Sequence, residues 1–239
     1  ADVLVENNVV KGVVTERGVT YKADTVIITT GTFLKGLIHI GKYQQKAGRM
    51  GDFSSEYLSD SLRNIGFEVG RLKTGTPARI NIKSIDFSKV ETQPNQNFQF
   101  CFSHFTTEAP KTLIDCYITY TNSKTHDIIN NNISRSPLFS GSIKGIGPRY
   151  CPSIEDKVVR FPDKERHQLF LEPEGLDTNE VYINGLSSSL PEDVQYDIVQ
   201  SIAGLENAQI IKMGYAVEYD YCNPIQLKNT LETKLVENL

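Results

Sequence analysis

Short runs of β-branched residues divide the N-terminal part of the sequence, and pairs of turn-forming residues separate them. The runs span residues 3–5, 9–14, 19–21 and 25–29, with Asn7-Asn8, Arg17-Gly18 and Ala23-Asp24 between them. Such runs, bounded by Asn, Gly or Asp, are typical of strands joined by tight turns. The pattern predicts a small antiparallel meander that feeds one buried strand, VIITTG, which ends at Gly31.

Farther along, the apolar spacing alternates between helix and strand periods. We expect a helix over residues 54–64, with Ser54 or Ser55 as its N-cap and Gly66 behind it. The segment FEVGRLKTGTPARINI predicts strand, turn and strand, and CYITYT predicts a further strand. Additional helices are expected over 125–131, over 191–203 with Pro191 in its first turn, and over the C-terminal residues 226–239. Together these elements predict a mixed α/β fold.

The turn Thr74-Gly75-Thr76-Pro77 is the expected crossing point between two domains. We expect residues 1–74 to form part of a first domain and residues 75–218 to form an inserted mixed α/β domain. Residues 219–239 then return to the first domain.

Composition excludes several classes of protein. With 239 residues, of which 39% are hydrophobic, the chain can bury a substantial core. No run approaches the roughly 18 apolar residues of a transmembrane helix, and the start ADVLVENN does not resemble a signal peptide. The four cysteines, at positions 101, 116, 151 and 222, lack the close spacing of a disulfide framework, which favours reduced thiols and a cytoplasmic location.

Basic residues are concentrated between residues 60 and 89, although the net charge of the chain is -4. That stretch contains Arg63, Arg71, Lys73, Arg79, Lys83 and Lys89 against Asp60, Glu68 and Asp86. The excess of positive charge fits either a solvated face or an anion-binding surface.

A metal site is not expected. Cys101, His104, Cys116 and His126 do not have the spacing of a tight Cys/His zinc set, and the strand-like alternation around them favours core or surface positions. The sequence also lacks a G-x-S-x-G elbow and a Walker lysine loop, which argues against serine hydrolases and P-loop nucleotide hydrolases.

The segment GPRYCPSIEDK places Cys151 in an unusual setting for a cysteine. Glycines and prolines restrict the backbone on both sides, and Arg149, Lys157 and Arg160 supply positive charge, which favours a thiolate. Ser153 resembles a helix N-cap, with Asp156 three residues later. From these residues alone, Cys151 is either a reactive nucleophile or an ordinary buried cysteine.

Several motifs, in order, carry a resemblance to a known family: IITTGTFLKGLIHIG, GRMGD, GRLKTGTPARI, CYITYTNSKTHD, GPRYCPSIEDKVVRF, HQLFLEPEG, NGLSSSLPEDVQ and GYAVEYD. Together they resemble the MnmG/GidA family of flavoproteins that modify the wobble uridine of transfer RNA. The resemblance implies a glutathione-reductase-type, Rossmann-like FAD-binding fold interrupted by an α/β domain that binds the nicotinamide nucleotide. Residues 1–74 and 219–239 would then belong to the FAD-binding domain and residues 75–218 to the insertion.

The resemblance also implies roles for individual residues. Thr30, Gly31, Thr32 and Ser55 fall on the flavin-binding part of the family pattern. The nicotinamide-binding stretch covers Gly147, Pro148, Arg149, Tyr150, Ser153, Ile154, Glu155, Asp156 and Lys157. Cys151 matches a catalytic cysteine, as nucleophile or as acid/base for a second cysteine. Arg71, Lys73, Arg79 and Arg160 are the expected contacts to RNA or cofactor phosphate.

The activity implied by the resemblance is addition of a (carboxymethyl)aminomethyl group to C5 of the wobble uridine. FAD, NADH and methylenetetrahydrofolate take part, and tRNA, the GTPase MnmE and a second copy of the chain are the implied partners. The family's Gly-rich phosphate loop and C-terminal helical domain are not in this sequence, which we interpret as an internal fragment. Two alternatives are a noncatalytic nucleotide- or tRNA-docking module and another FAD/NAD(P)H oxidoreductase, which would carry a closely spaced cysteine pair.

Overall fold

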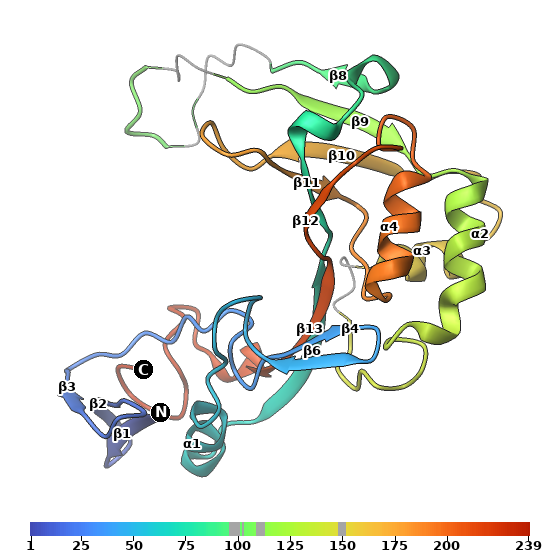
Figure 1. Cartoon of the computed structure of the whole chain (residues 1–239). Helices are drawn as coiled ribbons and strands as arrows, with labels where there is room; N and C mark the ends of the chain where they lie inside the picture. Colours follow the sequence, from blue (N-terminus) through green and yellow to red (C-terminus); the bar gives the residue numbers. More distant parts are fainter. Residues whose placement is uncertain (96–100, 102, 109–112, 148–151) are drawn as a thin grey trace. The chain divides into compact units, whose positions relative to one another are not determined.

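The described residues of the computed structural model are 1–95, 101, 103–108, 113–147 and 152–239. They form two compact units (Figure 1). Unit 1 comprises Ala1–Thr74, Ser140–Cys151 and Ala216–Leu239, and unit 2 comprises Gly75–Phe139 and Pro152–Tyr215. Within the described ranges, no helix is long and apolar enough to cross a membrane.

The N-terminal meander predicted from the sequence is confirmed in unit 1. Strands β1 (Asp2–Glu6), β2 (Val9–Val14) and β3 (Thr20–Lys22) form an antiparallel sheet in that order. The register of β1 shifts between Leu4 and Val5. Gly12 lies opposite this bulge with φ +143°, and a Cβ there would stand 2.0 Å from the Tyr21 carbonyl oxygen. Only glycine fits this position, because both the backbone angle and the close approach exclude a side chain.

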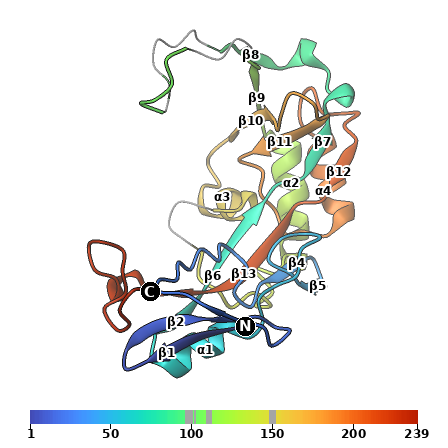
Figure 2. The same ribbon diagram turned by 90° about the vertical axis from the view of Figure 1, so that its left-hand side faces the viewer.

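The second sheet of unit 1 has the order β5-β4-β13-β6. Its strands are β4 (Leu37–Ile40), β5 (Tyr43–Lys46), β6 (Val69–Thr76) and β13 (Tyr215–Cys222). Helix α1 (Leu58–Ile65) packs beside β1 (Figure 2). The Val3 amide of β1 donates to Ser61 Oγ of this helix at 3.1 Å. Gly66, in the left-handed region, ends α1 as predicted.

The predicted N-cap of α1 is wrong, because Ser54 and Ser55 are engaged elsewhere. The Ser54 hydroxyl donates to Glu56, and the Ser55 amide donates to the Phe33 carbonyl at 2.8 Å. The helix therefore begins only at Leu58, with Tyr57 as an N-cap that makes no side-chain capping bond.

Residues 26–31, predicted as a buried strand, join no sheet in the described part of the chain, and Gly31 lies in a turn with φ +52°. The Val26 amide donates to the Asn238 carbonyl at 3.0 Å, and Val26 and Ile28 pack against the unit 1 core. Ile27 between them is 85% exposed. The side chains thus alternate as they do in a strand. Within the described residues, however, this segment is not fully buried and pairs with no neighbouring strand.

The predicted C-terminal helix is also wrong. After the short 3₁₀ turn η4 (Pro224–Gln226), residues 227–239 form turns, and Leu231 and Asn238 have positive φ angles of 68° and 65°. These angles are incompatible with a continuous right-handed helix. The turns bring Val236 into the same buried cluster as Val3 and Val10.

Unit 2 is built on a six-stranded sheet with the order β12-β7-β11-β10-β9-β8. The strands are β7 (Arg79–Asn81), β8 (Glu91–Gln93), β9 (Cys116–Tyr120), β10 (Gln168–Pro173), β11 (Glu180–Asn184) and β12 (Ile210–Lys212), and each pairs antiparallel with its neighbours. Three 3₁₀ turns accompany them: η1 (Ile82–Ser84), η2 (Phe87–Lys89) and η3 (Ile133–Arg135). The strand, turn and strand predicted for residues 67–82 are confirmed as β6 and β7.

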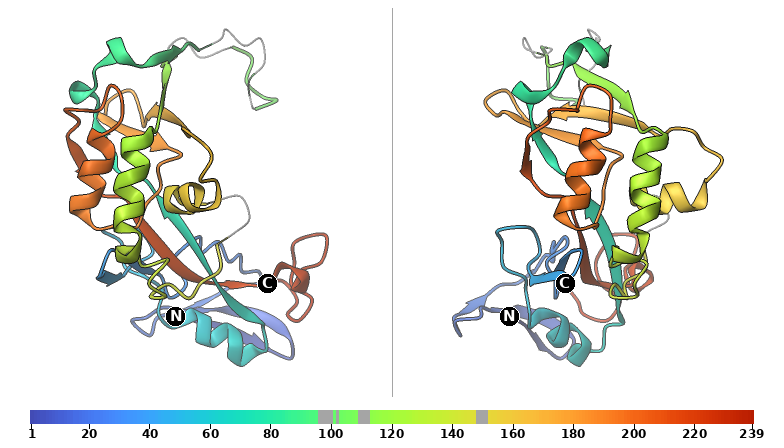
Figure 3. Two further views of the ribbon diagram at one scale, coloured as in Figure 1. Left: turned by 90° about the vertical axis from the view of Figure 1, so that its right-hand side faces the viewer. Right: turned by 45° about the vertical axis from the view of Figure 1, so that its right-hand side comes forward.

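Helices α2 (Ser123–Asn132), α3 (Ile154–Arg160) and α4 (Glu192–Gln200) complete unit 2, with α2 and α4 side by side (Figure 3). The core combines sheet residues such as Leu169, Leu171 and Ile183 with Ile129 and Ile198 from the helices. The predicted helices over 125–131 and 191–203 are confirmed with shifted ends. A capping box between Asn122 and Thr125 starts α2 earlier, and Pro191 is the N-cap of α4 rather than part of its first turn.

The expected boundaries place residues 140–147 in the inserted domain, whereas the structure groups them with unit 1. The Lys73 amide of β6 donates to the Ile146 carbonyl at 3.0 Å, and the Ile146 amide approaches the Arg71 carbonyl at 3.4 Å. This segment therefore pairs with a strand of unit 1.

Candidate functional site

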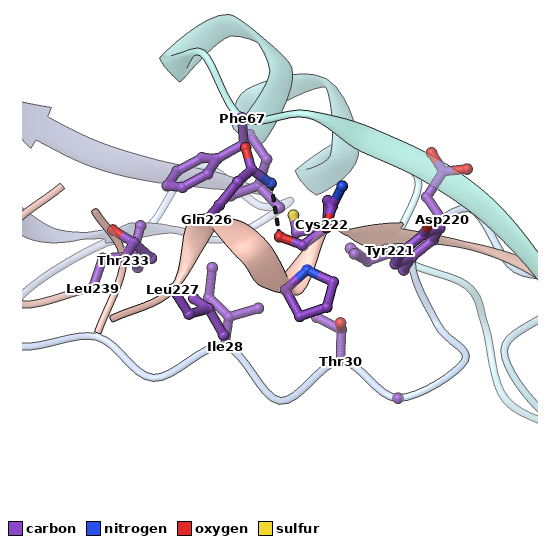
Figure 4. A pocket seen from close by; sticks show the side chains of 15 residues that line it. Ile28, Thr30, Phe67, Asp220, Tyr221, Cys222, Gln226, Leu227, Thr233 and Leu239 are labelled. Atoms are coloured by element: carbon purple, nitrogen blue, oxygen red, sulfur yellow. Dashed lines mark hydrogen bonds between the residues drawn. The ribbon is translucent and has the colours of Figure 1, made fainter. Parts of the chain in front are cut away.

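Unit 1 contains an apolar cavity of about 240 Å³ (Figure 4). Thr30 and Gly31, both predicted to contact a cofactor, lie in its wall with Phe67 and Leu239. Cys222 of β13 also lines it, and burial raises the pKa of the Cys222 thiol, so this sulfur is a neutral packing atom at neutral pH. The cavity suits a flat or apolar group with a few polar contacts at its edge.

The other two predicted flavin-contacting residues are engaged within the chain. Thr32 Oγ1 donates to the Gly48 carbonyl at 2.7 Å, and the Ser55 carbonyl accepts from the Lys35 amide at 2.9 Å. They are not among the residues that line the cavity. Thr32 and Ser55 instead hold together the segments that follow Gly31 and precede α1.

Next to the cavity wall, β13 carries a buried network of charged side chains. Glu218, 3% exposed, accepts from His39 Nε2 at 2.8 Å and from the amides of Lys144 and Gly145 at 2.8 and 2.7 Å. Asp220, two residues later, pairs with Arg71 and with Arg63, each at 2.8 Å. Every carboxylate of this network has hydrogen-bonding or cationic partners, which buried carboxylates require.

The segment held by Glu218 leads directly toward the predicted catalytic cysteine. Gly147 is its last described residue, and Pro148, Arg149, Tyr150 and Cys151 lie outside the described residues. The structure therefore shows how the chain is held before this tetrapeptide, and the roles assigned to those four residues stay predictions.

Helix α3 follows the tetrapeptide in sequence and begins as predicted, with Ser153 Oγ accepting from the Asp156 amide at 3.3 Å. Ile154 is fully buried in the unit 2 core. Glu155, also buried, accepts at 3.0 Å from both Ser188 Oγ and the Ser189 amide. The side chains of Ile154 and Glu155 thus anchor the helix start, and their predicted role in a cofactor site is untested.

Beside α3, unit 2 has a second cavity, of about 300 Å³. It is lined by Pro152, Lys157, Phe161, Lys164, His167 and Gln168. Lys157 Nζ donates to the Gly185 carbonyl at 3.1 Å, which fixes one ammonium in the wall. Among the described lining residues, two are lysines and none is a carboxylate, so the cavity favours an anion.

His167 is a buried titratable group in this wall, 6% exposed. Burial, together with the charges of His126, Lys157 and Lys164, lowers the pKa of His167 to about 4. The imidazole is therefore neutral at neutral pH in the folded chain, whereas in the unfolded chain it takes up a proton near its ordinary value of about 6.5.

We expect this histidine to make stability pH-dependent. Between pH 6.5 and about 4 the unfolded chain binds the extra proton, so stability falls as the pH falls through this window. Lowering the pH from 7 to 5 should reduce the free energy of unfolding of the wild type by about 1 kcal/mol more than that of His167→Gln. This figure is smaller than the pKa shift alone would give, because solvent screens part of the effect. Urea unfolding of both chains at the two pH values measures the difference; equal losses would contradict the assignment.

Three of the four residues predicted to contact RNA or phosphate are ion-paired or buried within their own unit. Arg71 pairs with Asp220, and Arg79 pairs with Glu174 at 2.8 Å and stacks over Tyr182 at 4.6 Å. Lys73 is 2% exposed. Arg160 remains largely exposed, 3.7 Å from Asp156. For Arg71 and Arg79 the structure favours roles in holding the fold, and the burial of Lys73 argues against a solvated phosphate contact.

The described residues contain no group of three or more His, Cys, Asp or Glu side chains that could hold a metal ion. Cys116 and His126, two of the residues considered for zinc, each have another setting. Burial raises the pKa of the Cys116 thiol, and His126 Nε2 lies 2.8 Å from Thr121 Oγ1.

Sequence reasoning missed the Glu218–His39 pair and the contribution of Lys164 and His167 to the second cavity. The sequence contained one signal for Glu218: this carboxylate directly follows Ala216 and Val217, apolar residues that are both buried in the same strand. His39 had none, because it lies 179 positions away along the sequence. Its role becomes visible only once β4 pairs with β13.

Comparison with known proteins decides the family. The family described as "Glucose inhibited division protein A" matches residues 1–239. The chain belongs to this family. This confirms the resemblance to the GidA proteins expected from the sequence motifs.

Two bacterial GidA relatives illustrate the similarity. The chain is 58% identical over 238 residues to a protein of Thermodesulfovibrio yellowstonii and 57% identical over 236 residues to one of Geobacter sulfurreducens. Both are named "tRNA uridine 5-carboxymethylaminomethyl modification enzyme MnmG". The matches cover 100% and 99% of this chain, which spans 38% of the length of each relative.

The GidA fold is confirmed by a solved structure. Aquifex aeolicus GidA in its form I crystal superposes with a TM-score of 0.90 at 53% identity, over 100% of this chain and 41% of that protein. The mixed α/β fold class, part of the Rossmann-like fold of the GidA proteins, is therefore correct.

Proposed function

We propose that the chain is part of a flavoenzyme that adds a (carboxymethyl)aminomethyl group to C5 of the wobble uridine of tRNA. The observation that carries this proposal is the match to proteins named as MnmG enzymes, at 58% identity across the whole chain. Unit 1 belongs to the flavin-binding domain, and unit 2 is the inserted domain for the nicotinamide nucleotide. FAD and NADH are the proposed cofactors, and methylenetetrahydrofolate is the proposed carbon donor.

The residues of unit 1 fit part of a flavin nucleotide. The cavity of about 240 Å³ is smaller than the usual 300 Å³ or more of a complete small-molecule site. Its apolar walls and the positive φ of Gly31, where a Cβ would meet no atom within 4 Å, leave room for one flat portion of the group. In this assignment Thr30 and Gly31 contact FAD, whereas Thr32 and Ser55 position the segments beside it.

The second cavity fits a phosphate group of the nicotinamide nucleotide. Lys157 and Lys164 supply positive charge, and neutral His167 and Gln168 add hydrogen-bonding groups. Lys157 belongs to the stretch for which the family pattern implies nicotinamide binding, and Lys164 and His167 extend that stretch. FAD, when bound, would supply the redox chemistry of the site, with NADH as its proposed reductant.

Cys151 is the proposed nucleophile toward uracil. Its thiolate adds to C6, and the electron pair of the C5–C6 double bond moves toward the C4 carbonyl oxygen, which makes C5 nucleophilic. C5 then bonds to a one-carbon electrophile, and loss of the C5 proton with expulsion of the thiolate restores the double bond. Arg149 and Lys157 are the neighbouring bases proposed to favour the thiolate.

The proposed partners are tRNA, the GTPase MnmE and a second copy of the chain, in the cytoplasm. The cytoplasmic assignment agrees with the free thiols of Cys101, Cys116 and Cys222 in the described chain. Arg160, the most exposed of the basic residues considered, is the proposed contact to RNA phosphate.

A complementation experiment tests the proposed function. The full-length protein, expressed in a bacterium that lacks this uridine modification, should restore the modified nucleoside in digested tRNA, detected by mass spectrometry. The purified protein should show flavin absorbance that NADH bleaches. Flavin absorbance without restored tRNA modification would instead support another FAD/NAD(P)H oxidoreductase, and absence of both would support a docking module.

A further inference from the structure

The Glu218 carboxylate joins three segments of unit 1 that are far apart in sequence. One oxygen, Oε1, accepts from the amides of Lys144 and Gly145, and the other, Oε2, accepts from His39 Nε2 of β4. Both carboxylate oxygens are thus used, at distances between 2.7 and 2.8 Å. The side chain connects the segment 144–147 to the central strands of the four-stranded sheet.

Backbone contacts to β6 hold the same segment from a second direction. Ile146 exchanges backbone hydrogen bonds with Lys73 and Arg71. A Cβ at Gly145 would stand 2.7 Å from the Leu72 carbonyl oxygen, so the backbone lies directly against the strand. Glu218 of β13 supplies the side-chain contacts to this segment. A substitution of Glu218 removes these contacts but none of the backbone groups that bond Ile146 to β6.

The charges around Glu218 favour its ionised form. Burial by itself would raise the pKa of the Glu218 carboxyl, but hydrogen bonds from the Gly145 and Lys144 amides and from His39 lower it overall. Arg71 Nε, 3.7 Å from Oε1, acts in the same direction. An ionised carboxylate that accepts two backbone amides makes stronger bonds than a neutral acceptor would.

We propose that Glu218 is a positioning residue: it fixes the backbone of residues 144–147 and thereby sets the position from which the Pro148–Cys151 tetrapeptide starts. Gly147 is covalently joined to Pro148, so displacement of 144–147 displaces the start of the tetrapeptide. Glu218 need not contact the substrate for this role. The proposal rests on the proposed function only where it concerns turnover, because the effect on Cys151 is measurable without tRNA.

The first test compares Glu218→Ala and Glu218→Gln with the wild type in the full-length protein. Hydrogen exchange of the 144–147 amides should be about tenfold faster or more in Glu218→Ala, because two amides lose their acceptor. Alkylation of Cys151 by iodoacetamide, followed by peptide mass spectrometry, should also differ in rate from the wild type. Glu218→Gln keeps a carbonyl oxygen for the two amides and should lie between wild type and Glu218→Ala in both measurements.

Gln195→Ala is the matched control. Gln195 is buried in unit 2 and bonds the Leu190 carbonyl and both backbone groups of Gly214, so its loss removes a similar number of buried hydrogen bonds. It should leave exchange at 144–147 and Cys151 alkylation unchanged. Wild-type rates in Glu218→Ala, or equal changes in Gln195→Ala, would overturn the proposal; if Glu218→Ala does not fold, Glu218→Gln against Gln195→Ala decides it.

Turnover gives a readout that a general loss of stability would not produce. At a temperature where all variants are folded, Glu218→Ala should lower kcat by about 100-fold through misplacement of Cys151, with little change in the KM for NADH. If Cys151→Ser proves fully active, the catalytic assignment fails, and the exchange and alkylation data still decide whether Glu218 holds this segment.

Discussion

Cys151→Ser is expected to lower tRNA modification by the full-length protein by about 1,000-fold or more, with flavin absorbance and tRNA binding retained. A serine hydroxyl is almost entirely protonated at neutral pH, whereas a cysteine beside cationic residues supplies thiolate. Addition to C6 of uracil requires that anion. The measurement is the amount of modified nucleoside formed per enzyme in a single-turnover reaction.

The control for this substitution is Cys116→Ser. Cys116 lies on β9 in unit 2, and burial raises the pKa of its thiol, so it should contribute packing only. Cys116→Ser should therefore modify tRNA at close to the wild-type rate. If Cys151→Ser also did so, with flavin and tRNA bound, Cys151 would have no chemical role.

RNA with 5-fluorouridine at the target position distinguishes a nucleophile from an acid/base residue. Fluorine at C5 blocks the proton loss that releases the thiolate, so a nucleophilic Cys151 should remain covalently bonded to the base. Mass spectrometry of the digested complex would locate the adduct. An adduct on a different cysteine would assign Cys151 the acid/base role instead.

Ile183→Ala is expected to destabilise the chain by about 2–5 kcal/mol, the usual cost of removing a large buried aliphatic side chain. Ile183 of β11 is fully buried and lies opposite Leu171 of β10 in the core of unit 2. Truncation of Ile183 to alanine leaves a cavity, because the hydrogen-bonded β-sheet around this side chain cannot move in to fill the space. Urea unfolding followed by circular dichroism measures the loss.

Ile183→Val is the matched control, because it removes a single methylene from the same position. It should cost about 0.5–1.5 kcal/mol. Equal costs for the two substitutions would show that the site relaxes around the missing atoms, and the packing described for unit 2 would then be wrong at this position.

Much of the fold was predictable because its signals are local. The meander follows from β-branched runs between turn residues, the end of α1 follows from Gly66, and the start of α3 follows from Ser153. In each case the residues that specify the element lie within a few positions of it. Such signals survive the influence of tertiary contacts.

The wrong predictions share a different cause. Residues 26–31 have the composition of a strand, but joining a sheet depends on neighbours that the local sequence does not specify. The segment 226–239 has helix-forming residues, yet burial of Val236 and Leu239 against the N-terminal meander imposes turns. Tertiary packing outweighed local propensity there.

The motifs of the candidate site could be predicted from the sequence, but the side-chain pairs that hold its segments in place could not. The sequence around Cys151 and Thr30-Gly31 could be interpreted directly. The Glu218–His39 pair depends on strand pairing between distant segments, and the pairing of Arg71 with Asp220 likewise appears only in three dimensions. A linear sequence shows which residues are charged, but not which of them neutralise one another.

The division of the chain into two units has a consequence for its biosynthesis. Unit 1 includes the final segment, Ala216–Leu239, whereas unit 2 needs only residues up to Tyr215. A ribosome therefore delivers all of unit 2 before the strand residues that carry Glu218 and Asp220 exist. Because domains fold as their residues emerge, the inserted unit can fold first, while β4, β5 and β6 wait for β13 to complete their sheet.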